Sequence, residues 1–177
     1  MVVRFASPAF LAIVMGWSAQ AASLCPAEAA RYIQRDGNRT TAALVPAGSF
    51  GTAASDLYLR IATTRHRYWF RIQSANGYGG LSLEAIHDPT TGAPAERGRP
   101  LAAPDIAEQA TPSRLIPLRR DLSEITDAPR TGTAAPEILL LPDLGPALWY
   151  DSAALGGNGE RERVSRSAFV LASCRRR

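Results

Sequence analysis

The stretch DLYLRIATTRHRYWFRIQSANGYGGLSLEAIHDP, residues 56–89, contains the strongest secondary-structure signal in the chain. Apolar and polar residues alternate along three runs within it, and this period of two is typical of half-buried β-strands. A turn at residues 64–65 sets Ile61 opposite Tyr68 and keeps the apolar side chains on one face. The glycines and asparagine of NGYGG tolerate the positive φ of a second turn. A three-stranded antiparallel meander is therefore predicted over residues 56–87.

Short strands are also predicted on both sides of the meander. They are expected at residues 40–46, 114–120, 137–141, 147–151 and 167–173, with a charged strand after the loop that begins at residue 155. The strand at 114–120 is expected at an edge, because its central proline cannot donate to a ladder. Residues 26–35 place Ala29, Tyr32 and Ile33 on one side at helical spacing, which predicts a short N-terminal helix.

About seven short strands and little helix predict a mainly β domain, either an antiparallel β-sandwich or a small barrel. The alternative is an α+β fold with one open antiparallel sheet. The connection 88–114 holds five prolines and little periodicity. It is expected to run over the surface or to pack against the domain as a lid, unless a helical turn forms over residues 104–110.

The chain begins with an order of residues that is typical of a secretory leader. One cation, Arg4, precedes the apolar run of residues 10–17, and Ala19 and Ala21 supply the small-x-small pattern of a cleavage site. The run is much shorter than the roughly 20 residues that span a bilayer, so no transmembrane anchor is expected. Residues 1–21 are predicted to be a cleaved signal peptide and the protein to be periplasmic or secreted.

The chain contains two cysteines, Cys25 and Cys174. A lipid anchor on Cys25 needs a small residue immediately before it, and the sequence has Leu24 there. Two cysteines in an exported chain are most simply a pair. We therefore predict a disulfide that joins the two ends of the mature chain, with a loop-entropy stabilisation of at most about 5 kcal/mol.

Composition limits the classes of protein to which the chain can belong. Residues 22–177 are enough for one core of ordinary size and too few for two, so a single domain is expected. The net charge of +4 is well short of a nucleic-acid-binding footprint, which argues against nucleic acid as a partner. All 20 basic residues are arginine, a bias that favours a bacterial origin.

One group of residues on the meander combines aromatic rings with arginines on the face opposite the core. An exposed tryptophan beside guanidinium forks suits a ligand with a sugar ring and an acidic group. Two alternatives stay open: the arginines cover the tryptophan by cation–π stacking, or the connection 88–114 buries it. Glu84 can also neutralise Arg71. The predicted ligand-binding residues are Tyr58, Arg60, Arg67, Trp69 and Arg71.

The two histidines, His66 and His87, flank the meander, and Asp88 follows the second. A small hydrolase that uses these three residues is an alternative to a binding function. Such catalysis needs a positioned nucleophile, and the sequence has no Gly-x-Ser-x-Gly elbow. With both cysteines in a disulfide, too few ligands remain for zinc. No metal or cofactor is expected, and enzymatic activity is disfavoured.

These patterns predict an exported single β-rich domain that acts by binding. The expected ligand is an anionic or sugar-containing component of the cell envelope, a polysaccharide or a lipid. A protein partner, as for a structural or inhibitory envelope protein, is the remaining alternative.

Overall fold

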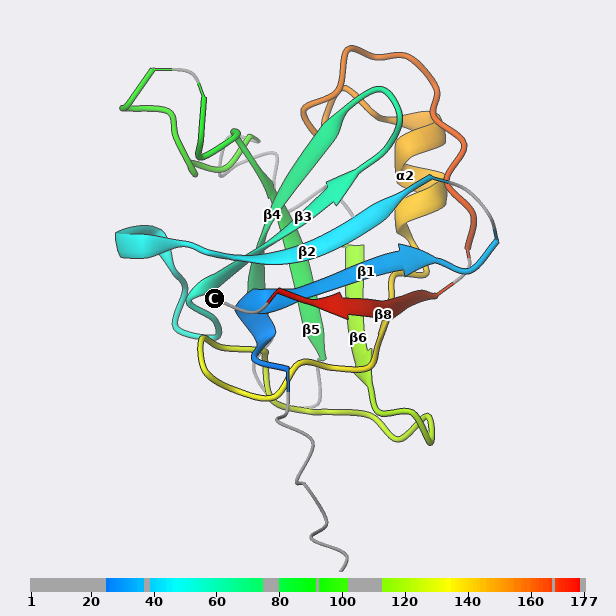
Figure 1. Cartoon of the computed structure of the whole chain (residues 1–177). Helices are drawn as coiled ribbons and strands as arrows, with labels where there is room; N and C mark the ends of the chain where they lie inside the picture. Colours follow the sequence, from blue (N-terminus) through cyan, green and yellow to red (C-terminus); the bar gives the residue numbers. More distant parts are fainter. Residues whose placement is uncertain are drawn as a thin grey trace, which may run out of the picture.

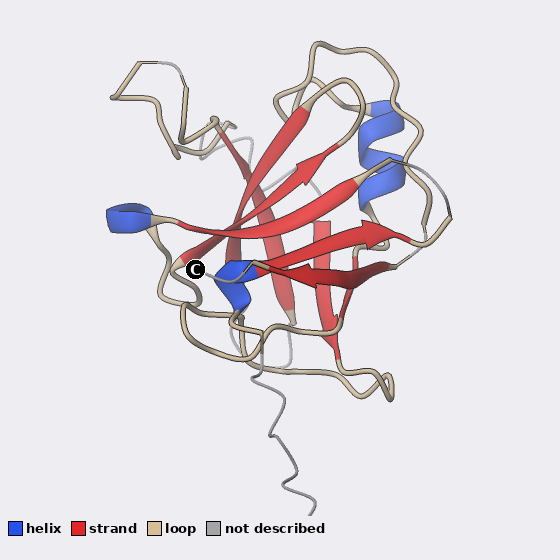
Figure 2. Ribbon diagram, in the orientation of Figure 1, coloured by secondary structure: helices blue, strands red, loops and turns tan. Residues whose placement is uncertain are grey.

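The chain folds into a closed antiparallel β-barrel of eight strands (Figures 1 and 2). This computed structural model describes residues 25–36, 39–74, 80–91, 93–101, 113–166 and 168–175. Each strand pairs with the next along the chain, and β1 pairs with β8 to close the barrel. The strands are β1 (Ala30–Gln34), β2 (Thr41–Pro46), β3 (Leu57–Ala62), β4 (Arg67–Ser74), β5 (Leu81–Ile86), β6 (Ser113–Leu118), β7 (Ile138–Leu140) and β8 (Phe169–Cys174).

Three short helical elements accompany the described strands. They are the 3-10 turns η1 (Ala27–Ala29) and η2 (Gly48–Phe50) and the α-helix α2 (Leu144–Tyr150). The prediction of a mainly β fold is confirmed, and the small barrel is the form that it takes. The alternative of one open sheet is wrong, because pairing of β1 with β8 leaves no open edge.

The register of the meander follows the predicted alternation. β3 pairs with β4 so that Ile61 lies opposite Tyr68, as a turn at residues 64–65 requires. Thr63 fixes this turn, because its hydroxyl oxygen accepts hydrogen bonds from the backbone N–H groups of Arg65 and His66 at 3.1 and 3.0 Å. β5 pairs along the other side of β4 and completes the three-stranded unit.

Alternate side chains of the strands fill the inside of the barrel. An eight-stranded barrel has an interior just wide enough for side chains to fill. A ligand therefore has to bind at an end of the barrel or on its outer face. The largest side chains of this core that are fully buried are Tyr32, Tyr68, Phe70, Phe169, Leu44, Leu57, Leu59, Ile61, Ile72, Leu115 and Leu139.

The helix predicted over residues 26–35 is wrong. Only the turn η1 forms there, and the chain then enters β1. Ala30, Tyr32 and Gln34 alternate toward the interior and are at most 3% exposed, so the period is two. The polar Gln34 hides this alternation in the sequence. Its burial is tolerated because the amide donates a hydrogen bond to the carbonyl oxygen of Ser165 at 3.0 Å.

The strand predicted over residues 147–151 is also wrong, because residues 147–150 belong to α2 and Asp151 caps its end. Leu144 and Leu148 lie one helical turn apart, and both are buried in the barrel core. Pro146 falls in the first turn, where its missing N–H breaks no intrahelical hydrogen bond. The charged strand expected after residue 155 does not form either, since residues 160–166 belong to no strand.

β6 is not the edge strand that Pro117 predicts. It pairs with β5 through residues 113–115 and with β7 through residues 116–118. The carbonyl oxygen of Pro117 accepts a hydrogen bond from the N–H of Ile125 at 2.8 Å and so points away from β7. The N–H and C=O of one strand residue face the same side, so the missing N–H removes no bond to β7.

The connection 88–114 is described in part, and its described part packs against the barrel. It runs back along the end of β5, where the N–H of Leu101 donates to the carbonyl oxygen of Ala85 at 3.0 Å. Gly98, at φ +69°, lies so close to Tyr58 that a Cβ there would be 2.6 Å from the tyrosine hydroxyl oxygen. The helical turn considered over residues 104–110 lies outside the described residues.

Cys25 and Cys174 form the predicted disulfide, with their Cα atoms 5.7 Å apart. The bond fastens the chain before β1 to the end of β8, next to the pair formed by Ala30 and Cys174. The leader predicted over residues 1–21 lies outside the described residues. Among the residues that are described, no helix has the length and apolarity needed to cross a bilayer.

Candidate functional site

One end of the barrel is closed by α2 and by residues 160–166 (Figure 1). Leu144 and Leu148 point from α2 into the core, and Val164 from the neighbouring segment joins them there. Trp149 and Tyr150 follow on the outer side of the helix. Tyr150 is 82% exposed, which is unusual for a large aromatic side chain.

Residues 160–166 lie close against α2. The N–H of Glu162 donates to the carbonyl oxygen of Leu148 at 3.2 Å. Gly145 permits this approach, because a Cβ at that position would lie only 2.6 Å from the carbonyl oxygen of Val164. The amide of Gln34 on β1 holds the carbonyl of Ser165 and so ties the segment to the barrel. The backbone on both sides is thus held in place.

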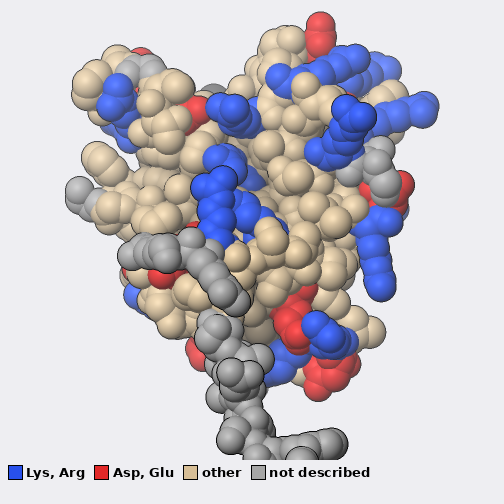
Figure 3. Space-filling model, viewed as in Figure 1, with Lys and Arg blue, Asp and Glu red and all other residues tan. Residues whose placement is uncertain are grey.

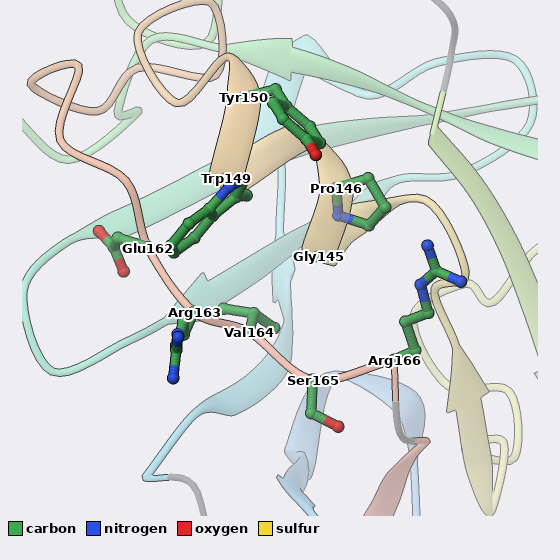
Figure 4. A pocket seen from close by; sticks show the side chains of 9 residues that line it. All are labelled: Gly145, Pro146, Trp149, Tyr150, Glu162, Arg163, Val164, Ser165 and Arg166. Atoms are coloured by element: carbon green, nitrogen blue, oxygen red, sulfur yellow. The ribbon is translucent and has the colours of Figure 1, made fainter.

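A groove of about 520 Å³ lies between α2 and this segment (Figure 4). In Figure 4, Trp149 and Tyr150 project from the helix, and Arg163 and Arg166 lie along the opposite side. A second hollow of about 340 Å³ shares Trp149, Glu162 and Arg163 with it. We call the first hollow the barrel-end groove; its lining is Gly145, Pro146, Trp149, Tyr150, Glu162, Arg163, Val164, Ser165 and Arg166.

Two arginines lie against Trp149. The guanidinium carbons of Arg161 and Arg163 are 5.5 and 5.7 Å from the centre of its ring. Both arginines are exposed, and neither forms an ion pair with a carboxylate among the described residues. The neighbouring Arg65, by contrast, is paired with Glu160 at 3.1 Å. The site therefore combines an aromatic surface with two forked donors that have no internal acid to bind.

Glu162 is the buried acid at this end of the barrel. Its carboxylate accepts a hydrogen bond from the hydroxyl of Tyr68 at 2.7 Å, and Nε2 of His66 lies 3.8 Å away. Burial raises the pKa of Tyr68, and the hydrogen bond to Glu162 and the charge of that carboxylate raise it further. The Glu162 side chain is 4% exposed. The exposed arginines are therefore the charged groups that a ligand can contact directly, although Glu162 also lines the groove.

The aromatic residues predicted to bind a ligand on the outer face of the meander are buried instead. Trp69 is 3% and Tyr58 2% exposed, in a small cluster with Ala47 and Ile86 outside the barrel core. The close approach of Gly98 to Tyr58 shows that the connection 88–114 contributes to this cover. The exposure expected for Trp69 is therefore not found, because the ring is buried within this cluster and Arg60 lies over it.

The three arginines of that predicted face differ in their surroundings. Arg60 lies directly opposite Trp69, as expected, with its guanidinium carbon 5.7 Å from the ring centre. Arg71 forms an ion pair with Glu84, as the sequence suggested, and Gln73 donates to the same carboxylate oxygen at 3.0 Å. Arg67 is exposed. Two of the five predicted residues, Arg60 and Arg67, thus keep guanidinium groups that no carboxylate of the described residues pairs with.

The residues of the alternative hydrolase do not come together. His66 faces Tyr68, with ring centres 6.2 Å apart, and the carboxylate of Glu162. Asp88 accepts hydrogen bonds from the N–H and hydroxyl of Thr90 at 2.7 and 2.6 Å. Among the described residues, no hydrogen bond or ion pair joins either histidine to Asp88. No group of three or more potential metal ligands occurs in this part of the chain either.

The arginines around Trp149 are not among the residues predicted from the sequence. The available signal was the run LWYD followed, after a glycine-rich loop, by the arginine-rich RERVSR. Only the fold brings these two runs together. No known protein family, curated protein or solved structure matches the chain.

Proposed function

We propose that the chain is an exported binding protein that takes an acidic sugar of the cell envelope in the barrel-end groove. The observation that carries this proposal is the position of Arg163, which lines the groove, against the ring of Trp149. Arg161 lies against the same ring and lines the adjoining second hollow. An aromatic ring stacks on the apolar face of a sugar where the guanidinium groups leave the ring uncovered, and a guanidinium fork binds a carboxylate through two parallel hydrogen bonds. Tyr150, 82% exposed on the same helix, extends the aromatic surface.

The place of the groove in the fold supports this choice. The interior of the barrel is filled by side chains, and ligand sites of such folds lie at the mouths of the barrel. α2 and residues 160–166 close that mouth with fixed backbone, so the groove exists before a ligand arrives. A preformed site loses less conformational entropy on binding.

Export is supported by the disulfide and by the leader-like sequence before residue 22. Disulfides persist in oxidising compartments such as the bacterial periplasm and are rare in the cytosol. The Cys25–Cys174 bond fastens the chain before β1 to the end of β8 and so supports the closure of the barrel. An envelope polysaccharide with uronic acid units is a ligand that such a compartment offers.

Binding of an oligogalacturonate to the full chain, measured by isothermal titration calorimetry, tests the proposal. Saturable binding is expected. A neutral galacto-oligosaccharide of the same length should bind much more weakly. Affinity should fall with added salt, since the arginines are exposed. Replacing Arg163 by Gln should weaken binding about tenfold, because a hydrogen bond to a charged group contributes about 1.5–3 kcal/mol.

Arg120→Gln is the matched control for this titration. Arg120 is exposed on the loop after β6 and pairs with Glu137, away from the groove. Its replacement removes the same unit of charge and should leave binding unchanged. Equal binding of the neutral and acidic oligosaccharides, or equal loss in the two arginine variants, would contradict the proposal.

A further inference from the structure

A second group of arginines lies on the outer face of the barrel, far along the sequence from Trp149. Arg31 on β1 and Arg60 on β3 are in register through Ala43 on β2, which lies between them. Ala43 is 1% exposed although it points away from the core, so the flanking side chains cover it. Together with Arg67 and Arg175, these residues form what we call the outer arginine cluster.

The chain holds the cluster in place through fixed backbone. The neighbours of Arg31 and Arg60 along their strands point into the core and are fully buried, so both arginines must face outward. Arg175 follows the disulfide-bonded Cys174, and its N–H donates to the carbonyl oxygen of Ala29 at 2.9 Å. Figure 3 shows arginine atoms gathered at the centre of this face.

The four guanidinium groups lie close enough for their charges to act on one another. Burial lowers the pKa of Arg31, and the charges of Arg175 and Arg60 lower it further. Burial likewise lowers the pKa of Arg60, as do the charges of Arg67 and Arg175, while Asp88 partly opposes them. No carboxylate of the described residues forms an ion pair with any of the four.

One donor of the cluster has no acceptor. Nη1 of Arg31 donates to the carbonyl oxygen of Ala30 at 2.9 Å, but Nε of the same side chain is buried and has no hydrogen-bond partner. A buried donor of a charged group without an acceptor is costly. Asp88, the acid whose charge reaches Arg60, is already held by Thr90. The described residues therefore supply no anion that pairs with the cluster.

We propose that the outer arginine cluster binds a phosphate group, either free or in a lipid headgroup. A phosphate has several acceptor oxygens and up to two negative charges, and guanidinium forks bind such oxygens in pairs. Arg31 and Arg60 lie two strand spacings apart, roughly 10 Å at the backbone, a span from which two long side chains can converge on one phosphate. This site is separate from the barrel-end groove and from its acidic sugar.

Trp69 provides the readout, because Arg60 lies over its ring. The chain has three tryptophans, so the full chain with Trp17→Phe and Trp149→Phe retains only Trp69. Sodium phosphate at constant ionic strength should change its emission in a saturable way, whereas sodium chloride should not. The same protein should sediment with phosphatidylcholine vesicles that contain phosphatidic acid if the phosphate belongs to a lipid. Because Trp149 is absent, the groove cannot produce the fluorescence signal.

Arg31→Gln and Arg67→Gln, each in this background, should weaken the response to phosphate about tenfold. Arg67 is exposed, so its variant keeps the test valid even if Arg31→Gln disturbs folding. Arg119→Gln, on the exposed loop after β6, is the charge-matched control and should bind as the parent does. A response to free phosphate identifies free phosphate as a ligand. A response to vesicles without a response to free phosphate identifies a lipid headgroup. No response to either, or equal losses in Arg119→Gln and Arg67→Gln, would overturn the proposal.

Discussion

Gly145 on α2 stands so close to Val164 that a Cβ on the glycine would lie 2.6 Å from the valine carbonyl oxygen. This approach lets residues 160–166 lie against the helix and brings Arg163 to the ring of Trp149. The barrel-end groove therefore depends on the absence of a side chain at one helical position. The same contact fastens the helix that closes the barrel.

Gly145→Ala should destabilise the fold by about 1–3 kcal/mol, because the added methyl group has to displace a backbone carbonyl. Alanine favours a helix more than glycine does, so a gain in stability would mean that the close approach is absent. Urea unfolding followed by circular dichroism measures the change. Gly80→Ala is the control, since a Cβ there meets nothing within 4 Å.

Gly98→Ala should expose Trp69. The added methyl group would press on the Tyr58 hydroxyl and lift residues 93–101 from the aromatic cluster. In the full chain with Trp69 as the single tryptophan, acrylamide quenching should increase. Gly132→Ala has a similarly positive φ but nothing within 4 Å, so it controls for backbone strain alone. Equal quenching in the two variants would mean that residues 93–101 do not shield Trp69.

Cys174→Ser should lower stability by up to about 5 kcal/mol, because the disulfide closes a loop with a sequence separation of 149. The melting temperature in non-reducing buffer should fall to that of the parent protein treated with a reductant. The released Cys25 should then react with a thiol reagent. An unchanged melting temperature would show that the pairing of β1 with β8 holds the barrel closed without the bond.

Stability should fall in alkaline solution, in part because of Tyr68; burial also raises the pKa of Tyr32 and Tyr58. The pKa of Tyr68 is raised in the folded state, so the folded protein keeps this proton at a pH where the unfolded chain, with an ordinary pKa of 10.0, has lost it. The contribution of this raised pKa to the free energy of unfolding is therefore complete below about pH 10 and is lost as the pH rises further. Urea unfolding between pH 9 and pH 11.5 should show this slope, reduced in Tyr68→Phe and unchanged in Tyr150→Phe. An equal slope in Tyr68→Phe and the parent would contradict the assignment.

The meander could be predicted because its local pattern and its tertiary role agree. Leu59 and Phe70 follow the alternation that decides which face is buried, and Thr63 supplies the turn between their strands. The N-terminal strand β1 could not be predicted, because Gln34 interrupts the apolar alternation. The hydrogen-bond partner of Gln34, Ser165, lies 131 residues away. A polar residue satisfied by such a distant group leaves no local sign that it is buried.

The candidate site was missed for a similar reason. At Trp69 the predicted pairing with Arg60 is correct, but the alternation alone does not show that Tyr58, Ile86 and Ala47 pack around the ring and bury it. At Trp149 the relevant arginines follow a loop, and only the contact between Gly145 and Val164 brings them to the helix. Periodicity shows which side of a strand a residue occupies and not which loop covers it.

The most direct test of the central claim is a ¹H–¹⁵N spectrum of the full chain during titration with an oligogalacturonate. The indole N–H signals of Trp69 and Trp149 report on the outer face and on the barrel-end groove within one sample, and Trp17→Phe and Trp149→Phe assign them. We predict a saturable shift of the Trp149 signal with no shift of the Trp69 signal. A Trp149 signal that stays in place at saturating oligogalacturonate, or that moves equally with the neutral oligosaccharide, would contradict binding of an acidic sugar at the end of the barrel.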